Sequence, residues 1–361
     1  MTKNNNTLSW VAWETTLRCN FSCIHCRSSS GENFTDTLPF GKARMILDKI
    51  AEFAKPVVVL SGGEPLLRPD IFDLAEYGAQ KGFRMCLATN GSLLTLDTCK
   101  SIKKSGIRLV SLSLDGADKE SHDSFRGYPG AFDHVLRATD LLKRESIEFI
   151  INSSFTRRNQ SQIHATYSLA KELGAKAWYM FMIIPTGRGE EVRNELISQE
   201  DYEEILRWHY QLEQTDTDML LRPTCAPQYY RVYAQEAKKA GKSTKRRTLS
   251  FSTGGDKGCV AGQRIAMIRH NGDVLPCSYF PVSGGNLFQS SLAEIWGSTV
   301  FRDMRDFKAY KDRCGVCEYS PVCGGCRARA YAYTGDYMEQ EPYCSYEPVL
   351  VKDELTRRSR K

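Results

Sequence analysis

Residues 19–26 read Cys-Asn-Phe-Ser-Cys-Ile-His-Cys, so Cys19, Cys23 and Cys26 fall within one short loop, with three and then two residues between them. A loop this tight can place three thiolates around one corner of an iron–sulfur cubane, and thiolates are the usual protein ligands of such clusters. Three thiolates on four irons leave one iron without a protein ligand. A chelating substrate or cofactor is the obvious candidate for that iron.

Two other uses of these cysteines fit the sequence less well. A disulfide framework is disfavoured because the chain has 13 cysteines, an odd number, and residues 1–10 (MTKNNNTLSW) lack the apolar stretch of a signal peptide. A zinc site made of the three cysteines and His25 stays open, although the close spacing favours a cubane. With no export signal, we expect the chain to stay in the cytoplasm, where reducing conditions keep thiols free for metal.

Length and composition are those of a soluble globular protein of two or three domains, with 361 residues and a formal charge of +6. The longest strongly apolar run, residues 177–185 (AWYMFMIIP), is far too short to span a bilayer. Much of the charge lies in residues 238–247 and 357–361, which we interpret as a solvated linker and a chain end. Because these stretches lack aromatic side chains, we expect no nucleic-acid partner. The charge remains compatible with an anionic small substrate.

Apolar, β-branched runs alternate with amphipathic segments over the first 214 residues. The runs predict strands at residues 10–15, 56–61, 83–89, 108–114, 147–154 and 177–183. The amphipathic segments predict helices at residues 41–54, 69–81, 96–105, 131–145, 160–173 and 200–214. Gly82, Gly106 and Gly174 follow three of these helices, where left-handed caps are expected.

Six strand–helix units predict parallel strands joined by right-handed crossovers. Six units are too few for a complete eight-unit barrel, so we expect an α/β fold with an open, partial (β/α)6 barrel of the TIM type. Sites in such sheets gather at the carboxyl ends of the strands, and the cysteine loop follows the first strand. We therefore expect the loop at that edge.

The alternation of strand and helix patterns ends after residue 214. We expect a barrel domain at residues 1–214, a connector at 215–249, a metal-stapled domain at 250–348 and a basic tail at 349–361. The third of these segments holds seven of the 13 cysteines.

A pentapeptide at the end of the second expected strand, Ser61-Gly62-Gly63-Glu64-Pro65, is a candidate ligand-binding turn. Its two glycines let a ligand approach the backbone amides closely, and its glutamate adds a carboxylate that can pair with an ammonium group. Alone, the pentapeptide is explained by a plain turn.

Taken with the cysteine loop, this turn resembles the radical S-adenosylmethionine (radical SAM) superfamily. The resemblance implies that Gly62, Gly63, Glu64 and Pro65 hold the amino group of S-adenosylmethionine. It further implies that four other residues bind the cofactor: His25, Asn90, Ser113 and Arg126. Of these, Ser113 and Arg126 would contact the ribose and the methionine carboxylate. For Ser113 and Arg126 a strand-end turn and a surface ion pair stay open as alternatives.

The C-terminal cysteines are similar to those of the SPASM domain, which carries auxiliary 4Fe–4S clusters in radical SAM enzymes. They are Cys259, Cys277, Cys314, Cys317, Cys323, Cys326 and Cys344. Only two residues, rather than the usual three, precede the sixth cysteine of this pattern. A zinc site at Cys314, Cys317, Cys323 and Cys326 competes, but it leaves the other three cysteines unexplained.

The family's interleaved pattern assigns Cys314, Cys317, Cys323 and Cys344 to a distal cluster. It leaves Cys259, Cys277 and Cys326 for a second one, which Cys225 could complete; that site could also be open or empty. Cys86 and Cys99 lie in apolar segments, and we expect them to be small buried side chains.

Further motifs resemble the tetrapyrrole-modifying branch of the superfamily, and most closely the heme synthases of the alternative, siroheme-dependent heme pathway. They are residues 13–16 (WETT), 26–27 (CR), 185–189 (PTGRG), 224–227 (TCAP), 229–231 (YYR), 323–330 (CGGCRARA), 334–337 (TGDY) and 341–344 (EPYC). The resemblance implies oxidative decarboxylation of two propionates of iron-coproporphyrin III to vinyl groups, which gives protoheme. It also implies a low-potential electron donor of the flavodoxin or ferredoxin type.

Porphyrin propionates need cations, and Arg188, Arg222 and Arg231 are the candidates, because a planar guanidinium matches a carboxylate at two points. Tyr229 and Tyr230 are candidates to face the macrocycle, and Cys225 is a further candidate for contact with the substrate. Surface or helix-cap arginines and core aromatics are the competing interpretations.

The alternative functions are a related enzyme that removes side chains from decarboxylated siroheme, one acting toward heme d, a SPASM peptide maturase, and an electron carrier.

Overall fold

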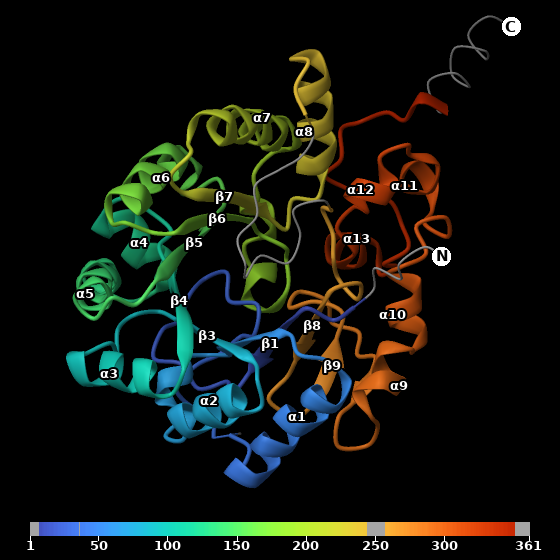
Figure 1. Ribbon diagram of the computed structural model, residues 1–361. Coiled ribbons are helices and arrows are strands. Elements are labelled where there is room, and N and C mark those ends of the chain that lie inside the picture. The colour runs from blue at the N-terminus through green and yellow to red at the C-terminus, as the bar shows by residue number, and fades with distance from the viewer. Residues whose placement is uncertain (1–6, 36, 244–256, 351–361) are drawn as a thin grey trace, which may run out of the picture.

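The computed structural model describes residues 7–35, 37–243 and 257–350, which form one ten-stranded sheet and its covering helices (Figure 1). The strands are β1 (Trp10–Glu14), β2 (Val57–Ser61), β3 (Arg84–Thr89), β4 (Ile107–Ser113), β5 (Phe149–Phe155), β6 (Ala177–Met182), β7 (Leu220–Thr224), β8 (Ile265–Ile268), β9 (Asp273–Leu275) and β10 (Gly285–Asn286). Their order is β10-β9-β8-β1-β2-β3-β4-β5-β6-β7, and β1 to β7 are parallel. This confirms the partial parallel barrel.

Helices surround the outer face of the curved sheet in Figure 1. They are α1 (Phe40–Phe53), α2 (Ile71–Gln80), α3 (Leu96–Lys104), α4 (Lys119–Arg126), α5 (Ala131–Arg144), α6 (Ile163–Glu172) and α7 (Gln199–Thr215). Gly82, Gly106 and Gly174 have φ angles of +85°, +79° and +84°, which confirms the expected left-handed caps. Within the described residues, none of the helices has both the length and the apolarity that crossing a membrane requires.

The strands alternate between the helix-covered core and an internal cavity, as the two-residue period of a strand requires. In β2, Val58 and Leu60 are buried in the main core, whereas Val57, Val59 and Ser61 line the cavity. The same alternation places a further set of side chains on the cavity face: Cys86, Ala88, Leu109, Ser111, Ser113, Ile150, Asn152, Ser154, Tyr179 and Phe181. The inner face of the barrel is therefore mostly apolar, with hydroxyl and amide groups nearer the carboxyl ends of its strands.

The segment expected to be a plain connector, residues 215–249, differs from the prediction. It contains the strand β7 and the helix α8 (Gln228–Lys239), and residues 244–249 lie outside the described part of the chain. β7 pairs with β6 in parallel, with Tyr179 opposite Arg222. Proline cannot donate to a ladder, but Pro223 is tolerated in β7 because β7 is the outermost strand of the sheet.

The cysteine-rich C-terminal region continues the same sheet. β8 lies parallel to β1, with Trp10 opposite Ile265, and β9 and β10 follow it antiparallel. Short helices complete the region: α9 (Leu292–Trp296), α10 (Thr299–Asp303), α11 (Asp312–Val316), α12 (Ser320–Cys323) and α13 (Arg327–Thr334). Because β8 adjoins β1, the C-terminal region lies directly beside the cysteine loop. Of the expected basic tail, residues 351–361 lie outside the described residues.

Candidate active site

A cavity of about 460 Å³ lies inside the barrel, and it draws its walls from both halves of the chain. The inner sheet face forms its apolar part. The cysteine loop after β1 contributes Cys19, Cys23 and Cys26, and the C-terminal region contributes Cys259, Cys277 and Cys326. All 13 cysteines are free thiols, so no disulfide competes for them.

Backbone hydrogen bonds close the base of the cysteine loop. The amide of Cys19 donates to the carbonyl of Gly31 at 3.0 Å, and the amide of Gly31 donates to the carbonyl of Leu17 at 3.2 Å. Arg188 braces the far side, because its Nε donates to the carbonyl of Cys23 at 2.9 Å and its Nη1 to that of Ser30 at 2.6 Å. The loop thus presents its three thiols to the cavity from a fixed backbone.

The three thiols fit the corner of a cluster. Cys19, Cys23 and Cys26 all line one cavity of about 460 Å³, which has room for a group larger than a single ion. Burial raises the pKa of Cys19 to about 12 and also raises that of Cys23. These thiols therefore need a bound cation to become thiolates, which the irons of a cluster supply.

Gly62 and Gly63 are required by close packing against the chain that leads into the cysteine loop. A Cβ atom at either position would lie 2.2 Å from a backbone oxygen, that of Thr16 for Gly62 and that of Arg18 for Gly63. The amide of Gly63 donates to the Thr16 carbonyl at 2.7 Å. Both glycines line the cavity, so they fix the base of the cysteine loop and leave open space beside it.

Glu64 is not among the residues that line the cavity, so its expected contact with an ammonium group stays a prediction. The side chain is fully buried and accepts hydrogen bonds from the amides of Leu66 (3.1 Å) and Asn90 (2.8 Å) and from the hydroxyl of Thr89 (2.8 Å). Burial raises the pKa of Glu64 to about 7. Pro65 begins a 3₁₀ turn and also lies outside the cavity lining. Glu64 thus ties the end of β2 to the end of β3.

The other expected cofactor residues line the cavity. Asn90 donates from Nδ2 to Oδ1 of Asn20 in the cysteine loop at 2.9 Å. Arg126 forms a buried ion pair with Asp115, with Nε 2.5 Å from Oδ2, and its Nη1 lies 3.8 Å from Sγ of Cys23. This pair is buried, so the surface ion-pair alternative for Arg126 is not what the structure shows. Ser113 and His25 also face the cavity, and His25 stacks on Phe125 with ring centroids 4.5 Å apart.

The remaining metal-site candidates fall into two groups. Cys225, Cys259, Cys277 and Cys326 line the main cavity, and we call them the inner cysteine set. Cys314, Cys317, Cys323 and Cys344 line a separate, smaller pocket, and we call them the outer cysteine set. This is the grouping that the family's interleaved pattern implied. The competing zinc site needs Cys326 among the outer cysteines, and the structure places it with the inner ones.

Cys86 and Cys99 are both buried, as expected. Cys99 belongs to α3 and is buried in the main core. Cys86 also reaches the cavity from β3, where it belongs to the apolar inner face.

Two of the expected substrate residues lie elsewhere. Arg231 is outside the cavity, where it pairs with Glu203 (Nη2–Oε2 2.6 Å) and lies over the ring of Tyr346. Tyr229 is fully buried in the core and donates to Glu213 at 2.6 Å. Successive residues of α8 point in different directions, so of the three adjacent candidates only Tyr230 reaches the cavity.

Arg188 and Arg222 do line the cavity. Arg222 projects from the inner face of β7, and its Nη1 donates to the hydroxyl of Tyr230 at 3.0 Å. Sequence reasoning gave no role in the site to several further polar residues of the lining, among them Arg27, Lys257 and Tyr279. For Arg27 and Tyr279, their positions next to cysteines, one residue after Cys26 and two after Cys277, were the available signal.

Comparisons with known proteins agree with this geometry. Residues 13–170 match the model of the radical SAM superfamily, and residues 259–326 match that of the SPASM iron–sulfur cluster-binding domain. An AdoMet-dependent heme synthase of Methanosarcina barkeri is 44% identical over 94% of this chain and 96% of its own length. A second protein of that name, from Nitratidesulfovibrio vulgaris, is 39% identical over 95% and 93%.

Two more distant similarities, to one relative and to one solved structure, were also found. The Fe-coproporphyrin III synthase of Methanosarcina barkeri is 28% identical over 96% of this chain and 88% of its own. The crystal structure of SuiB from Streptococcus suis bound to S-adenosylmethionine superimposes with a TM-score of 0.72 at 18% identity, covering 95% of this chain and 79% of that one. At that identity the likeness shows the fold alone.

Proposed function

The chain belongs to the radical SAM superfamily and carries a SPASM domain, and from this premise we propose that it is a heme synthase. The proposed reaction converts two propionate side chains of iron-coproporphyrin III into vinyl groups and yields protoheme. Each propionate loses one hydrogen atom, carbon dioxide and one electron. The relatives that share 44% and 39% identity with this chain over almost its full length support this assignment.

The family's cofactors are S-adenosylmethionine and a 4Fe–4S cluster. We propose that Cys19, Cys23 and Cys26, which line the cavity, would hold that cluster. When bound, these cofactors supply a carbon-centred abstractor of hydrogen atoms, which the reaction needs because the propionate β-carbon has no acidic proton. The chain has to bind the macrocycle, exclude water and orient the propionate beside the cysteine loop.

One observation carries the proposal: the cysteine loop and the inner cysteine set face the same cavity. The apolar inner face of the sheet, with Tyr179 and Phe181, suits the face of a macrocycle. Arg222 and Arg188 add guanidinium groups that suit its carboxylates. A substrate in this cavity lies between the two groups of cysteines.

The electron that remains after decarboxylation needs an acceptor, and we assign that role to an auxiliary cluster on the inner cysteine set. Its position on the same cavity supports direct transfer from the substrate. Reduction of the cluster at Cys19, Cys23 and Cys26 calls for a low-potential donor of the flavodoxin or ferredoxin type. A reducing compartment such as the cytoplasm suits 13 free thiols.

The test is product analysis under anaerobic conditions. Reconstituted protein, a strong reductant, S-adenosylmethionine and iron-coproporphyrin III should give protoheme and deoxyadenosine, with two deoxyadenosines for each protoheme. Conversion of decarboxylated siroheme to iron-coproporphyrin III instead would assign the chain to the sister reaction. The 28% identity to the Fe-coproporphyrin III synthase of Methanosarcina barkeri, against 44% to the heme synthase of the same organism, favours the first outcome. Modification of a precursor peptide instead would favour a maturase.

A further inference from the structure

Tyr279 lines the cavity that both groups of cysteines face, and the proposed function does not yet use it. It follows Cys277 by two residues and lines the main cavity. Cys26 and Arg27 of the cysteine loop and Cys225 and Cys277 of the inner cysteine set line this same cavity. A ligand that bridges these two groups of cysteines therefore occupies the cavity that the phenol lines.

Tyr279 is half-buried, and none of the hydrogen bonds between described residues involves its hydroxyl. A phenol hydroxyl can donate one hydrogen bond and can also accept. A phenol that faces a cavity without a partner is consequently poised to donate to a ligand.

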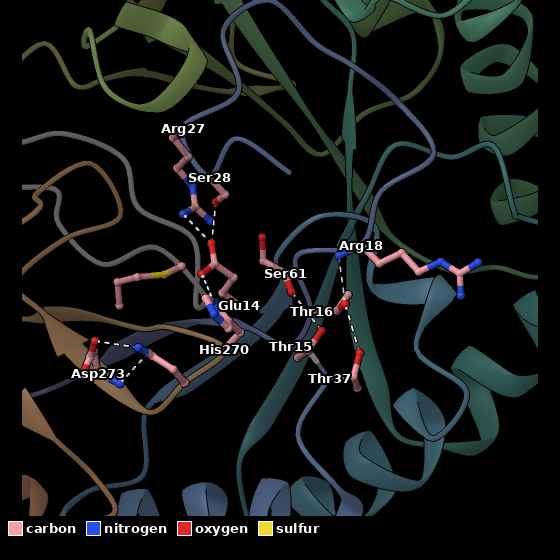
Figure 2. A network of polar contacts seen from close by, with 12 residues as sticks. Glu14, Thr15, Thr16, Arg18, Arg27, Ser28, Thr37, Ser61, His270 and Asp273 are labelled. Carbon is pink, nitrogen blue, oxygen red and sulfur yellow. Dashed lines mark hydrogen bonds and ion pairs between the residues drawn. The ribbon is translucent and has the colours of Figure 1, made fainter. Parts of the chain in front are cut away.

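Arg27 supplies a second donor in the same part of the cavity. It follows Cys26 directly and lines the cavity, and its Nη1 lies 3.5 Å from Oε1 of Glu14. Glu14 is itself fixed, because it accepts from the hydroxyl of Ser28 at 2.5 Å and lies 3.2 Å from Nδ1 of His270 (Figure 2). The guanidinium has five N–H donors, so this one long contact leaves most of them available.

We propose that Arg27 and Tyr279 form a two-point subsite for a carboxylate of the substrate, between the cysteine loop and the inner cysteine set. This inference rests on the proposed function, because it assigns the binding of one substrate propionate to Arg27 and Tyr279. Guanidinium and phenol both donate, and a carboxylate only accepts, so the three groups are complementary. Glu14 acts as a positioning residue, since it holds Arg27 and is held from the C-terminal region by His270.

S-adenosylmethionine also carries a carboxylate, and the experiment separates the two sources. The Tyr279→Phe variant removes only the hydroxyl, and Arg27→Gln removes the charge. Arg18→Gln is the matched control for Arg27, because Arg18 precedes Cys19, is exposed, and points away from Arg27 in Figure 2. Tyr333→Phe, on the exposed Tyr333, is the control for the phenol. Iron and sulfide are quantified for every protein.

Three measurements are made on anaerobic holoenzyme: the affinity for iron-coproporphyrin III by spectral titration, the affinity for its tetramethyl ester, and the apparent KM for S-adenosylmethionine in reductive cleavage without porphyrin. We expect Tyr279→Phe to weaken binding of iron-coproporphyrin III about tenfold and Arg27→Gln more than tenfold. Binding of the ester and the KM for S-adenosylmethionine should stay unchanged, as should all properties of both controls.

The outcomes are distinct. If Tyr279→Phe binds iron-coproporphyrin III as tightly as the wild type, the subsite is overturned while the proposed function stands. If the variants instead raise the KM for S-adenosylmethionine and leave porphyrin binding unchanged, the subsite belongs to the cofactor and the proposal is also overturned. A wild-type protein that binds no iron-tetrapyrrole would overturn the proposed function and the subsite together.

Discussion

Arg329 donates a hydrogen bond of 2.9 Å to the carbonyl oxygen of Cys225, although 104 residues separate them in the chain. Arg329 is itself paired with Glu341 (Nη1–Oε1 3.2 Å), and Glu341 accepts from the amide of Cys326 at 2.6 Å. Cys225 has a φ angle of +57°, an uncommon conformation for a residue with a side chain. The C-terminal region therefore fixes the backbone from which the Cys225 thiol joins the inner cysteine set.

This arrangement predicts that Cys225 is the fourth ligand of the inner auxiliary cluster. Cys225→Ala should lower the iron and sulfide retained per chain after exposure to a chelator, because one corner of the cluster loses its thiolate. The control is Cys99→Ala, since Cys99 is buried in the core away from the cavity. Equal retention by Cys225→Ala and the wild type would show that the cluster is held by three thiolates or is absent.

Gly63→Ala should destabilise the chain and loosen the cysteine loop. Its new Cβ would lie 2.2 Å from the carbonyl oxygen of Arg18, and the amide of Glu64 donates to that same oxygen at 2.8 Å. We expect a loss of about 1–3 kcal/mol in the free energy of unfolding, as for other overpacked sites, together with lower iron content.

Gly41→Ala is the matched control, because a Cβ at Gly41 in α1 meets nothing within 4 Å. It should be neutral or stabilise the helix by up to about 1 kcal/mol. Denaturant titration measures both variants, and equal stability of the two would contradict the packing argument.

Glu64→Gln should reduce stability by about 1–3 kcal/mol, because one of the hydrogen-bond donors around Glu64 would then face the amide nitrogen of glutamine. Thermal unfolding of the two proteins at one pH measures the difference. If the variant is as stable as the wild type, the hydrogen bonds from Thr89 and Asn90 to Glu64 do not hold β2 to β3.

The pH dependence of stability should also change in Glu64→Gln. Burial raises the pKa of Glu64 to about 7 from an ordinary value of 4.5, so the folded chain binds more protons than the unfolded chain between these values. The contribution of Glu64 to stability therefore falls as the pH rises through this window. The slope of unfolding free energy against pH should be flatter in the variant, and an unchanged slope would argue against the raised pKa.

Arg222 and Arg231 should behave differently, although both were substrate candidates by sequence. Arg222→Ala should weaken the binding of iron-coproporphyrin III about tenfold, because Arg222 lines the cavity. Arg231→Ala should leave that affinity unchanged and lower the melting temperature, because its partner is Glu203. Spectral titration and thermal unfolding of both variants check the pair. A lower porphyrin affinity in Arg231→Ala would contradict the placement of Arg231.

The cysteine loop and the strands of the first half were predictable because their signals are local. The spacing of Cys19, Cys23 and Cys26 and the turn at Gly62 and Gly63 lie within a few residues, and the strands carry continuous apolar runs. The strand β7 was not predictable in the same way, because Pro223 contradicts a strand unless the strand is at the edge of the sheet.

The orientation of side chains at the site depended on contacts between distant segments. Glu64 stands in a motif that suggests ligand contact, yet its hydrogen bonds to Thr89 and Asn90 turn it into the protein. Tyr229, Tyr230 and Arg231 are adjacent in sequence, but the helical turn of α8 sends only Tyr230 into the cavity. No periodicity argument separates such neighbours when the buried faces of the helix are unknown.

The sequence was sufficient to predict the parallel α/β barrel, the three-cysteine loop and the family, because hydrophobic periodicity and short cysteine spacings are local patterns. The cavity shared by Cys26 and Cys277, the inward thiol of Cys225 and the presence of both Arg27 and Tyr279 in the lining came only from the folded chain. They arise because β8 pairs with β1, which brings residues some 250 positions apart to the same end of one sheet. Such pairing follows from the packing of the whole molecule and leaves no local trace in the sequence.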